Sequence, residues 1–269
     1  MIADETVMVK LIWQHIEELL RYRSLIGSLV TRELKARYRG SLLGFLWTFL
    51  NPLLLLGVYA LVFNVYLRIQ MEHYAGFMFV GLLPWIWFAS ALQEGSVSIT
   101  AGGSLVTKVL FPSQVLPWVK IFSNLLNYLL SLPILFIFLW IMGVFQGWTL
   151  LWLPLIIVIH LLFITGLVTM VATINVFFRD IQYILANLLT LWFFLTPILY
   201  PLSQVPGPFQ KWVLLNPMTL ITLAYQDIFF YRRVPNPWYL LSLFILSLLL
   251  LGIGIILFES YKDTFAEKI

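Results

Sequence analysis

A dense basic run stands directly before a long apolar stretch near the start of the chain, and Ser41–Gly44 separate the two. Arginine clamps phosphate oxygens through two parallel hydrogen bonds, and glycine lets the backbone approach such a group closely. The pattern therefore predicts a site for an anionic lipid headgroup. The candidate residues are Arg32, Lys35, Arg37, Arg39, Ser41 and Gly44. Anchoring is the alternative, because the positive-inside rule alone explains several cations near a first membrane span.

The composition is that of an integral membrane protein. Hydrophobic residues make up 61% of the 269 residues and charged residues only 10%, against about 25% charged residues in soluble domains. The mean hydropathy is +0.95. Because the apolar stretches are much longer than the roughly 10 residues of a barrel strand and do not alternate, they predict helices. The expected fold class is an all-α integral membrane protein.

Segment length and periodicity divide the chain into three parts. In the first part, 1–41, an amphipathic pattern over 8–30 predicts a helix that lies in the membrane interface. The second part, 42–258, contains six apolar segments near the ~20 residues that a bilayer requires, and 259–269 form a tail. The expected spans are 42–67, 76–99, 117–143, 150–176, 183–200 and 237–258.

The distribution of positive charge predicts the orientation. With six spans both termini lie on one side, and the segments on that side carry eleven lysine and arginine residues against four on the other. Because cytoplasmic loops carry the excess of these residues, we expect both termini to be cytoplasmic.

The segment 201–236, between the fifth and sixth expected spans, contains repeated prolines and apolar stretches at 209–215 and 218–230. We expect two short re-entrant helices that dip back into the outer leaflet, since irregular backbone at membrane depth is tolerated where it lines a cavity or packs on protein. A gate at the outer mouth and an ordinary amphipathic cap are the two interpretations of these helices.

The loop 100–116 is expected on the cytoplasmic side. Gly102 and Gly103 end the incoming helix, and Ser104 can cap a short new one. An apolar helix lying along the membrane surface fits a groove on a soluble partner, although a simple connector explains the loop equally well. The candidate docking residues are Ser104, Leu105, Lys108, Val109, Leu110, Phe111 and Pro112.

Aromatic residues make up 17% of the chain. Interfacial belts and packing explain most of them. A sharper interpretation is a path for sugars, because the C–H faces of sugar rings stack weakly on aromatic planes. The candidates for such a path are Trp85, Trp87, Trp192, Phe193, Phe194 and Tyr200.

Ionisable residues inside the expected spans are scarce. Glu94, Lys120 and His160 are the main ones, and we expect His160 to be hydrogen-bonded within the bundle. Proton- and sodium-coupled carriers usually need buried carboxylates or histidines, so the scarcity argues against such carriers and against a membrane hydrolase. The residues predict neither a catalytic group nor a metal site, and the absence of cysteine excludes thiol-ligated metals. Energy for transport is expected to come from a partner.

The basic junction resembles that of a known family. An interfacial helix followed by Arg37-Tyr-Arg-Gly-Ser-Leu-Leu-Gly44, then Trp47 and Pro52, is similar to the permease subunit of ABC-type polysaccharide exporters. Further segments look like later signatures of that family, in the same order: 108–117, 175–181, 196–200 and 216–217. The family exports the O-antigen of lipopolysaccharide, capsule and teichoic-acid chains.

The resemblance implies a homodimeric permease in the bacterial cytoplasmic (inner) membrane, working with two copies of a separate ATP-binding cassette subunit. That partner binds ATP and Mg and hydrolyses the ATP, and this chain has no G-x-x-x-x-G-K-[ST] motif of its own. The implied substrate is a glycan on undecaprenyl pyrophosphate, and nucleic acid has no role. By the same resemblance, the Ser41–Gly44 loop meets the lipid headgroup, 104–112 dock on the ATPase, and 202–231 form the outer gate.

Other functions stay open at this point. An exporter of drugs or small lipids has the same fold, and the basic and aromatic residues favour a glycan over a drug. A passive channel predicts transport without an ATPase. A membrane transferase should carry a cluster of carboxylates or histidines, which the sequence does not show. A scaffold subunit should tolerate changes to Arg37, Arg39 and Gly44.

Overall fold

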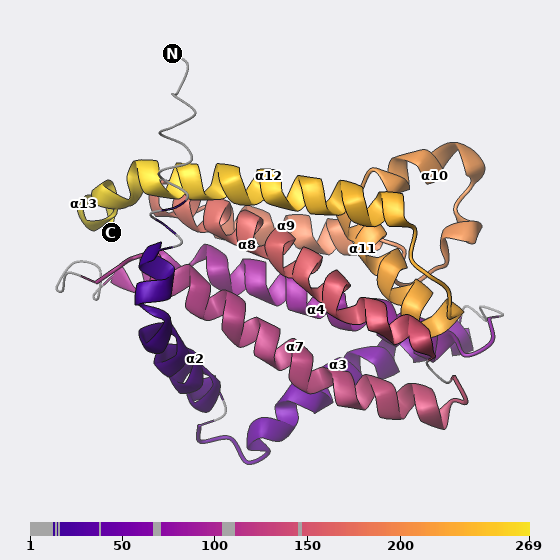
Figure 1. The fold of residues 1–269 in the computed structure, drawn as a ribbon. Helices are drawn as coiled ribbons and strands as arrows, with labels where there is room; N and C mark the ends of the chain where they lie inside the picture. Colours follow the sequence, from indigo (N-terminus) through magenta and orange to yellow (C-terminus); the bar gives the residue numbers. More distant parts are fainter. Residues whose placement is uncertain are drawn as a thin grey trace.

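The computed structural model describes residues 13, 15, 17–37, 39–66, 71–103, 111–144 and 147–269, and every regular element in these residues is a helix (Figure 1). This confirms the all-α fold class. The α-helices are α2 (Arg23–Arg37), α3 (Trp47–Ala60), α4 (Tyr74–Ser96), α5 (Ser98–Ala101), α7 (Val115–Ile141), α8 (Leu153–Phe177), α9 (Ile181–Phe194), α10 (Gly207–Leu214), α11 (Pro217–Gln226), α12 (Pro237–Tyr261) and α13 (Phe265–Lys268). Short π-helical segments continue α3 to Tyr66 and α11 to Tyr231.

Four helical segments in the described residues are long and apolar enough to cross a membrane by themselves. They coincide with four of the expected spans and are Tyr74–Ser96, Val115–Ile141, Trp148–Phe177 and Pro237–Lys268. The segments Trp47–Phe63 and Ile181–Phe194 are apolar but shorter. The 14 residues of α9 rise only about 21 Å, against a hydrocarbon core of ~30 Å. The chain is therefore a multi-pass helical membrane protein, and the count of six spans stays a prediction.

The segment between α9 and α12 folds into two helical pieces, Gly207–Leu214 and Pro217–Tyr231, with a bend of 99° between them. Asn216 and Asn236 cap α11 and α12, and each accepts a hydrogen bond from the backbone N–H two residues further on. A proline follows each cap, at the position where a missing N–H costs nothing. This bent pair has the form of a broken span or of a re-entrant pair, and the re-entrant interpretation stays a prediction.

The central helix of the bundle is α4, which packs against α3, α7, α8, α9 and α11 and buries most of its side chains. Helices α8 and α12 lie side by side along much of their length (Figure 1). Two glycines make this contact possible, because a Cβ atom on Gly254 would lie 2.8 Å from the carbonyl oxygen of Gly166. Small residues permit such close approach of helices in membrane proteins.

Helix α2 leaves the bundle at the end where the C-terminus also lies (Figure 1). Its buried side chains, Ile26 and Val30, pack against the first turns of α7. The amphipathic pattern ends at residue 30, but the helix continues to Arg37. Arg, Leu, Lys and Ala favour helices, and cations in a last turn suit the helix dipole. The basic run is therefore helical over most of its length. Residues 8–12, 14 and 16 of the expected interfacial helix lie outside the described residues.

Candidate functional site

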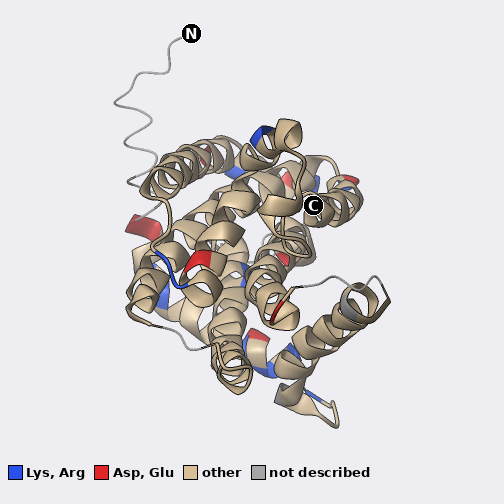
Figure 2. Ribbon diagram, turned by 90° about the vertical axis from the view of Figure 1, so that its right-hand side faces the viewer, with Lys and Arg blue, Asp and Glu red and all other residues tan. Residues whose placement is uncertain are grey.

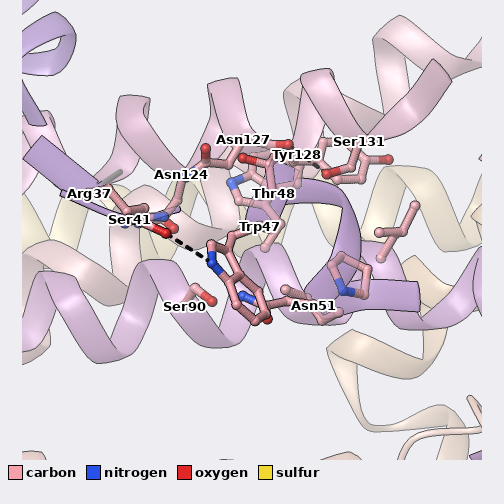
Figure 3. Close-up of a pocket in the computed structure, with 14 residues that line it drawn as sticks. Arg37, Ser41, Trp47, Thr48, Asn51, Ser90, Asn124, Asn127, Tyr128 and Ser131 are labelled. Carbon is pink, nitrogen blue, oxygen red and sulfur yellow. Dashed lines mark hydrogen bonds between the residues drawn. The ribbon is translucent and has the colours of Figure 1, made fainter. Parts of the chain in front are cut away.

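The chain turns sharply between α2 and α3. Gly40 (φ 78°) and Gly44 (φ 47°) both adopt the left-handed backbone conformation that favours glycine. Ser41 Oγ accepts a hydrogen bond from the Gly44 N–H at 3.3 Å. It accepts another from Trp47 Nε1 at 3.1 Å (Figure 3). A Cβ atom on either glycine would meet no atom within 4 Å. Within this chain the two glycines therefore support the turn itself, and their close approach to a headgroup stays a prediction.

Arg37, the last residue of α2, pairs with Glu94 near the end of α4. Its Nη2 lies 2.6 Å from Glu94 Oε1 and 2.7 Å from Oε2, and Asn124 of α7 donates to Glu94 Oε2 at 3.0 Å. A second ion pair joins Glu33 of α2 to Lys120 of α7. Together these contacts hold the end of α2 against α4 and α7. The sequence pattern did not indicate this pairing, because 57 positions separate Arg37 from Glu94.

The other three basic candidates, Arg32, Lys35 and Arg39, are exposed. In the part of the chain that the structure describes, none of them has an acidic partner. Figure 2 shows that acidic and basic residues are sparse along the ribbons of the bundle. Such cations are available to an anionic lipid surface, and their role in headgroup binding stays a prediction.

A cavity of about 420 Å³ lies between α3, α4 and α7, directly beside the junction (Figure 3). Arg37 and Ser41 form part of its wall, and Trp87 and Tyr128 form another part. Six further lining residues are polar and uncharged: Thr48, Asn51, Ser90, Asn124, Asn127 and Ser131. Polar side chains inside a membrane are costly unless they face a cavity or a partner. Their concentration here marks the cavity as a place that can bind a polar group.

One face of α7 supplies four of these lining residues. Asn124, Asn127, Tyr128 and Ser131 lie at positions i, i+3, i+4 and i+7, a spacing that places side chains on one side of a helix. We did not single out these residues from the sequence. The sequence nevertheless contains a signal that could have identified them, because polar residues at helical spacing in an otherwise apolar span predict a polar face.

Trp87 and Tyr128 stack face to face on the cavity wall, with ring centroids 4.7 Å apart and an interplanar angle of 13°. His160 of α8 lies next to Trp87, with ring centroids 4.5 Å apart. It is fully buried, and neither ring nitrogen has a hydrogen-bond partner among the described residues. The expectation that His160 is hydrogen-bonded is therefore wrong. Contacts with Trp87 and with Tyr225, at 6.0 Å, hold the ring instead.

Of the six candidate aromatics for a sugar path, only Trp87 lines this cavity. Trp85, Phe193 and Phe194 line a separate, mainly apolar pocket of about 450 Å³ between α3, α4 and α9. Rings in that pocket can meet a lipid chain or a partner helix as readily as a sugar. The polar cavity is therefore lined mainly by residues other than the six aromatic residues that the sequence analysis proposed for a sugar path.

The remaining two aromatic candidates make hydrogen bonds within the chain. Trp192 Nε1 donates to Asn216 Oδ1 at 2.7 Å, and the Tyr200 hydroxyl donates to the backbone oxygen of Phe194 at 3.0 Å. Both contacts hold the chain in place where it leaves α9 and enters the bent segment. Trp192 and Tyr200 thus have a structural role that the sequence did not indicate.

Most of the predicted docking loop lies outside the described residues, including Ser104, Leu105, Lys108, Val109 and Leu110. Phe111 is described and packs partly buried against the contact between α2 and α7. Phe111 and Pro112 also line a groove of about 340 Å³, together with Glu18 and Lys262. Phe111 therefore has an internal packing role in addition to any role in docking, which stays a prediction.

The fold and the site define a multi-pass helical membrane protein with a polar cavity that adjoins a basic junction. The family model described as ABC-2 type transporter matches residues 24–230. The chain belongs to this family.

Several characterised proteins are similar to the chain over almost its whole length. The O-antigen export system permease protein RfbA of Myxococcus xanthus is 46% identical over 94% of this chain and 98% of its own length. The protein of the same name from Klebsiella pneumoniae is 32% identical over 90% of this chain and 94% of its own length. The capsule polysaccharide export inner-membrane protein CtrC of Neisseria meningitidis is 26% identical over 90% of this chain and 93% of its own length.

Proposed function

We propose that this chain is the membrane-spanning permease of an ATP-driven exporter that moves a lipid-linked polysaccharide across the cytoplasmic membrane. Membership of the ABC-2 type transporter family supports the transporter class. The names of the similar proteins, which export O-antigen and capsule polysaccharide, support a glycan as the substrate.

The observation that carries the proposal is the polar cavity beside the basic junction. Arg37 and Ser41 at its mouth, followed by amide and hydroxyl side chains, are groups that hydrogen-bond phosphate and sugar hydroxyls. The stacked pair Trp87–Tyr128 adds an aromatic surface on the cavity wall. The number of amide and hydroxyl side chains in this lining supports a glycan over an apolar drug.

The headgroup site extends the same proposal to the end of α2. The exposed cations Arg32, Lys35 and Arg39 attract the pyrophosphate of an undecaprenyl carrier, and Arg37, in the same basic run, forms part of the cavity wall. A glycan attached to that headgroup then lies at the cavity mouth. This arrangement keeps the lipid tail in the membrane while the sugars reach polar side chains.

The proposed complex contains two copies of this chain and two ATP-binding cassette subunits, which bind ATP and Mg. In this complex residues 104–112 dock on the ATPase, and both termini are cytoplasmic. Helices α3 and α9, which are short for a membrane span, present exposed apolar residues on which a second copy can pack: Leu54, Val58, Leu188, Leu191 and Phe194. The bent pair α10 and α11 serves as the outer gate.

Co-purification from the native host tests the proposal. The tagged chain is isolated in mild detergent, and mass spectrometry identifies both the proteins and the lipids that it retains. We expect a stoichiometric ATP-binding cassette subunit and an undecaprenyl-linked glycan. An ATPase accompanied by small lipids and no glycan would contradict the substrate class, and transport without any ATPase would indicate a channel.

A deletion strain gives the functional half of the test. Without the chain, undecaprenyl-linked polysaccharide should accumulate on the cytoplasmic side and disappear from the cell surface. The wild-type gene should restore surface polysaccharide, and the same gene expressed with a hydrolysis-deficient ATPase should not. Normal surface polysaccharide in the deletion strain would contradict the proposed function.

A further inference from the structure

An apolar groove lies between α2, the helical residues that precede it, α7 and α12. Its volume is about 840 Å³, which is within the range for ligand pockets. Apart from His15 and Arg23, every described residue that lines it is apolar or a glycine. The groove shares no lining residue with the polar cavity. Arg37, which belongs to that cavity, lies about 21 Å further along α2 than Arg23, so the groove is a separate feature.

Each wall of the groove is one stripe of a helix. The wall on α7 runs from Trp118 to Leu126 and the wall on α12 from Leu248 to Ile255, with lining residues that recur every three or four positions. Such spacing places side chains on one side of a helix. The third wall, within 19–30, follows the same spacing. Three apolar stripes from distant parts of the chain thus face one groove.

Two glycines widen the groove from different walls. Gly27 of α2 and Gly252 of α12 both line it, and a Cβ atom on either would meet no atom within 4 Å. Glycine weakens a helix relative to alanine. Gly254 is different, because its contact with Gly166 requires a residue without a side chain. Close packing of helices does not explain Gly27 and Gly252, which instead leave room for a ligand.

The groove has the length of one membrane leaflet. Its α7 wall, from Trp118 to Leu126, rises about 12 Å, and its α12 wall, from Leu248 to Ile255, rises about 10 Å. One leaflet contributes about 15 Å to the hydrocarbon core. Trp118 lies in the first turn of α7, at the end of the bundle where α2 and the C-terminus also lie (Figure 1). A lipid chain from the leaflet at that end therefore fits the groove.

Arg23 is the cation that the groove offers to a ligand. Its side chain is exposed and has no acidic partner in the part of the chain that the structure describes. The other ionisable lining residue, His15, is 1% exposed and hydrogen-bonds Glu259 at 2.7 Å. A guanidinium binds phosphate through two parallel hydrogen bonds. A lipid with net negative charge gains most from this cation, because a zwitterionic lipid brings a positive charge of its own.

The surroundings select a lipid over other ligands. The chain is a multi-pass membrane protein, so lipid is the medium around a groove at this depth. The apolar lining offers a sugar or a water-soluble metabolite few hydrogen-bonding groups. A second copy of the chain that covered the groove would bury Arg23 without a counter-charge, which is costly. A phospholipid supplies both the apolar chain and the phosphate.

We propose that the groove binds one anionic phospholipid of the leaflet at this end of the bundle. Its acyl chain lies between α2, α7 and α12, and its phosphate contacts Arg23. Helix α2 packs on α7 through Ile26 and Val30, and the lipid chain extends that contact to α12. The lipid is therefore a structural part of the junction that leads to the basic run. This inference does not depend on what the transporter exports.

Site-specific photo-cross-linking tests the proposal on the full chain, in the assembly in which it purifies. The probe is a nanodisc of equal parts phosphatidylglycerol, which is anionic, and phosphatidylcholine, which is zwitterionic. A benzophenone amino acid is placed at Leu126, which lines the groove, or at Leu129 of the same helix, which does not; both are 38% exposed. We expect the lipid captured at position 126 to be enriched in phosphatidylglycerol roughly five-fold. The lipid captured at position 129 should have the composition of the nanodisc.

Two arginine variants test the phosphate contact. Arg23→Gln removes the cation of the groove and should abolish the enrichment at position 126. Arg179→Gln removes an exposed arginine in the turn between α8 and α9, which does not line the groove, and should keep the enrichment. Neither change is expected to disturb folding, because both side chains are exposed.

Two phenylalanine variants test the space. Gly252→Phe places a ring in the groove and should abolish the enrichment at position 126. Ser242→Phe places the same ring at an exposed position of α12 that does not line the groove, and should keep the enrichment. Phenylalanine is a better helix former than glycine, so the groove variant should keep α12 intact.

Enrichment at position 126 that both groove variants abolish and both controls keep supports the site. Equal lipid composition at positions 126 and 129 overturns it, because the groove then holds only non-specific lipid of the surrounding membrane. Enrichment that persists in Arg23→Gln overturns the phosphate contact. Cross-links from position 126 to a second copy of the chain or to another protein, in place of lipid, overturn the class of ligand. Each of these results leaves the export function as it stands, since lipid capture is measured without transport.

Discussion

Arg37 at the end of α2 and Glu94 near the end of α4 form an ion pair in which one guanidinium nitrogen contacts both carboxylate oxygens, at 2.6 and 2.7 Å. The pair lies at the mouth of the polar cavity, where Arg37 is also a wall residue. Arg37 therefore fixes α2 to the bundle, and presenting positive charge to a headgroup is its proposed second role.

A neutral double variant separates these roles. Arg37→Gln with Glu94→Gln keeps hydrogen-bonding groups at both positions and removes both charges. We expect the complex to assemble with a stability change of about 1 kcal/mol or less, as is usual for a partly exposed ion pair, and to lose most of its export. Surface polysaccharide, complex assembly and thermal unfolding are the measurements. Normal export in the double variant would leave Arg37 with a structural role alone.

Gly44→Ala tests the turn that leads into α3. Alanine in the left-handed conformation costs about 1–2 kcal/mol, so we expect a lower unfolding temperature and reduced export. Gly57→Ala is the matched control, since Gly57 lies within α3 and a Cβ atom there also meets nothing within 4 Å. Alanine is the better helix former, so the control should be unchanged or slightly stabilised. Equal behaviour of the two variants would argue against a strained turn.

Asn51→Leu tests whether the cavity carries a polar substrate. Asn51 lines the cavity, and loss of one hydrogen bond of about 0.5–1.5 kcal/mol should slow export roughly two- to ten-fold. Ser242→Leu, at an exposed position of α12 that does not line the cavity, should export normally. The rate is measured as polysaccharide reaching the cell surface after induction. An unchanged rate for Asn51→Leu would count against the polar path and favour an apolar substrate.

Lys108→Asp tests the docking of the loop 104–112. We expect ATP hydrolysis to continue while export falls, because a reversed charge weakens the contact that couples the two subunits. Phe111→Asp is a poor test, since Phe111 packs against α2 and α7 and a buried charge would disturb that contact. Phe111→Leu keeps this packing apolar and should preserve the contact with α2 and α7. Coupling that is normal in Lys108→Asp would remove the docking assignment.

Gly254→Ala tests the contact between α8 and α12. A methyl group there would approach the Gly166 carbonyl oxygen to 2.8 Å, and overpacking of this kind typically costs about 1–3 kcal/mol. Gly252→Ala, two residues away on the same helix, meets nothing within 4 Å and should be neutral. Thermal unfolding in detergent compares the two. Equal unfolding temperatures would show that the helices can separate without loss of stability.

The sequence by itself predicted the helical membrane class and the four long apolar spans. This was possible because the thickness of the bilayer sets the length of an apolar helix, independently of which helices become neighbours. It also predicted the basic junction, where residue types alone indicate a phosphate-binding chemistry. The two Asn-Pro caps that begin α11 and α12 are equally local signals.

Only the tertiary structure decided which of these residues act together. Glu94 pairs with Arg37, and Asn51 lines the same cavity as the polar face of α7, because α3, α4 and α7 pack around that cavity. Trp87 faces that cavity whereas Trp192 bonds Asn216, although both looked alike as tryptophans in aromatic clusters. The direction of a ring depends on the rotation of its helix about its own axis, and contacts between helices distant in sequence set that rotation.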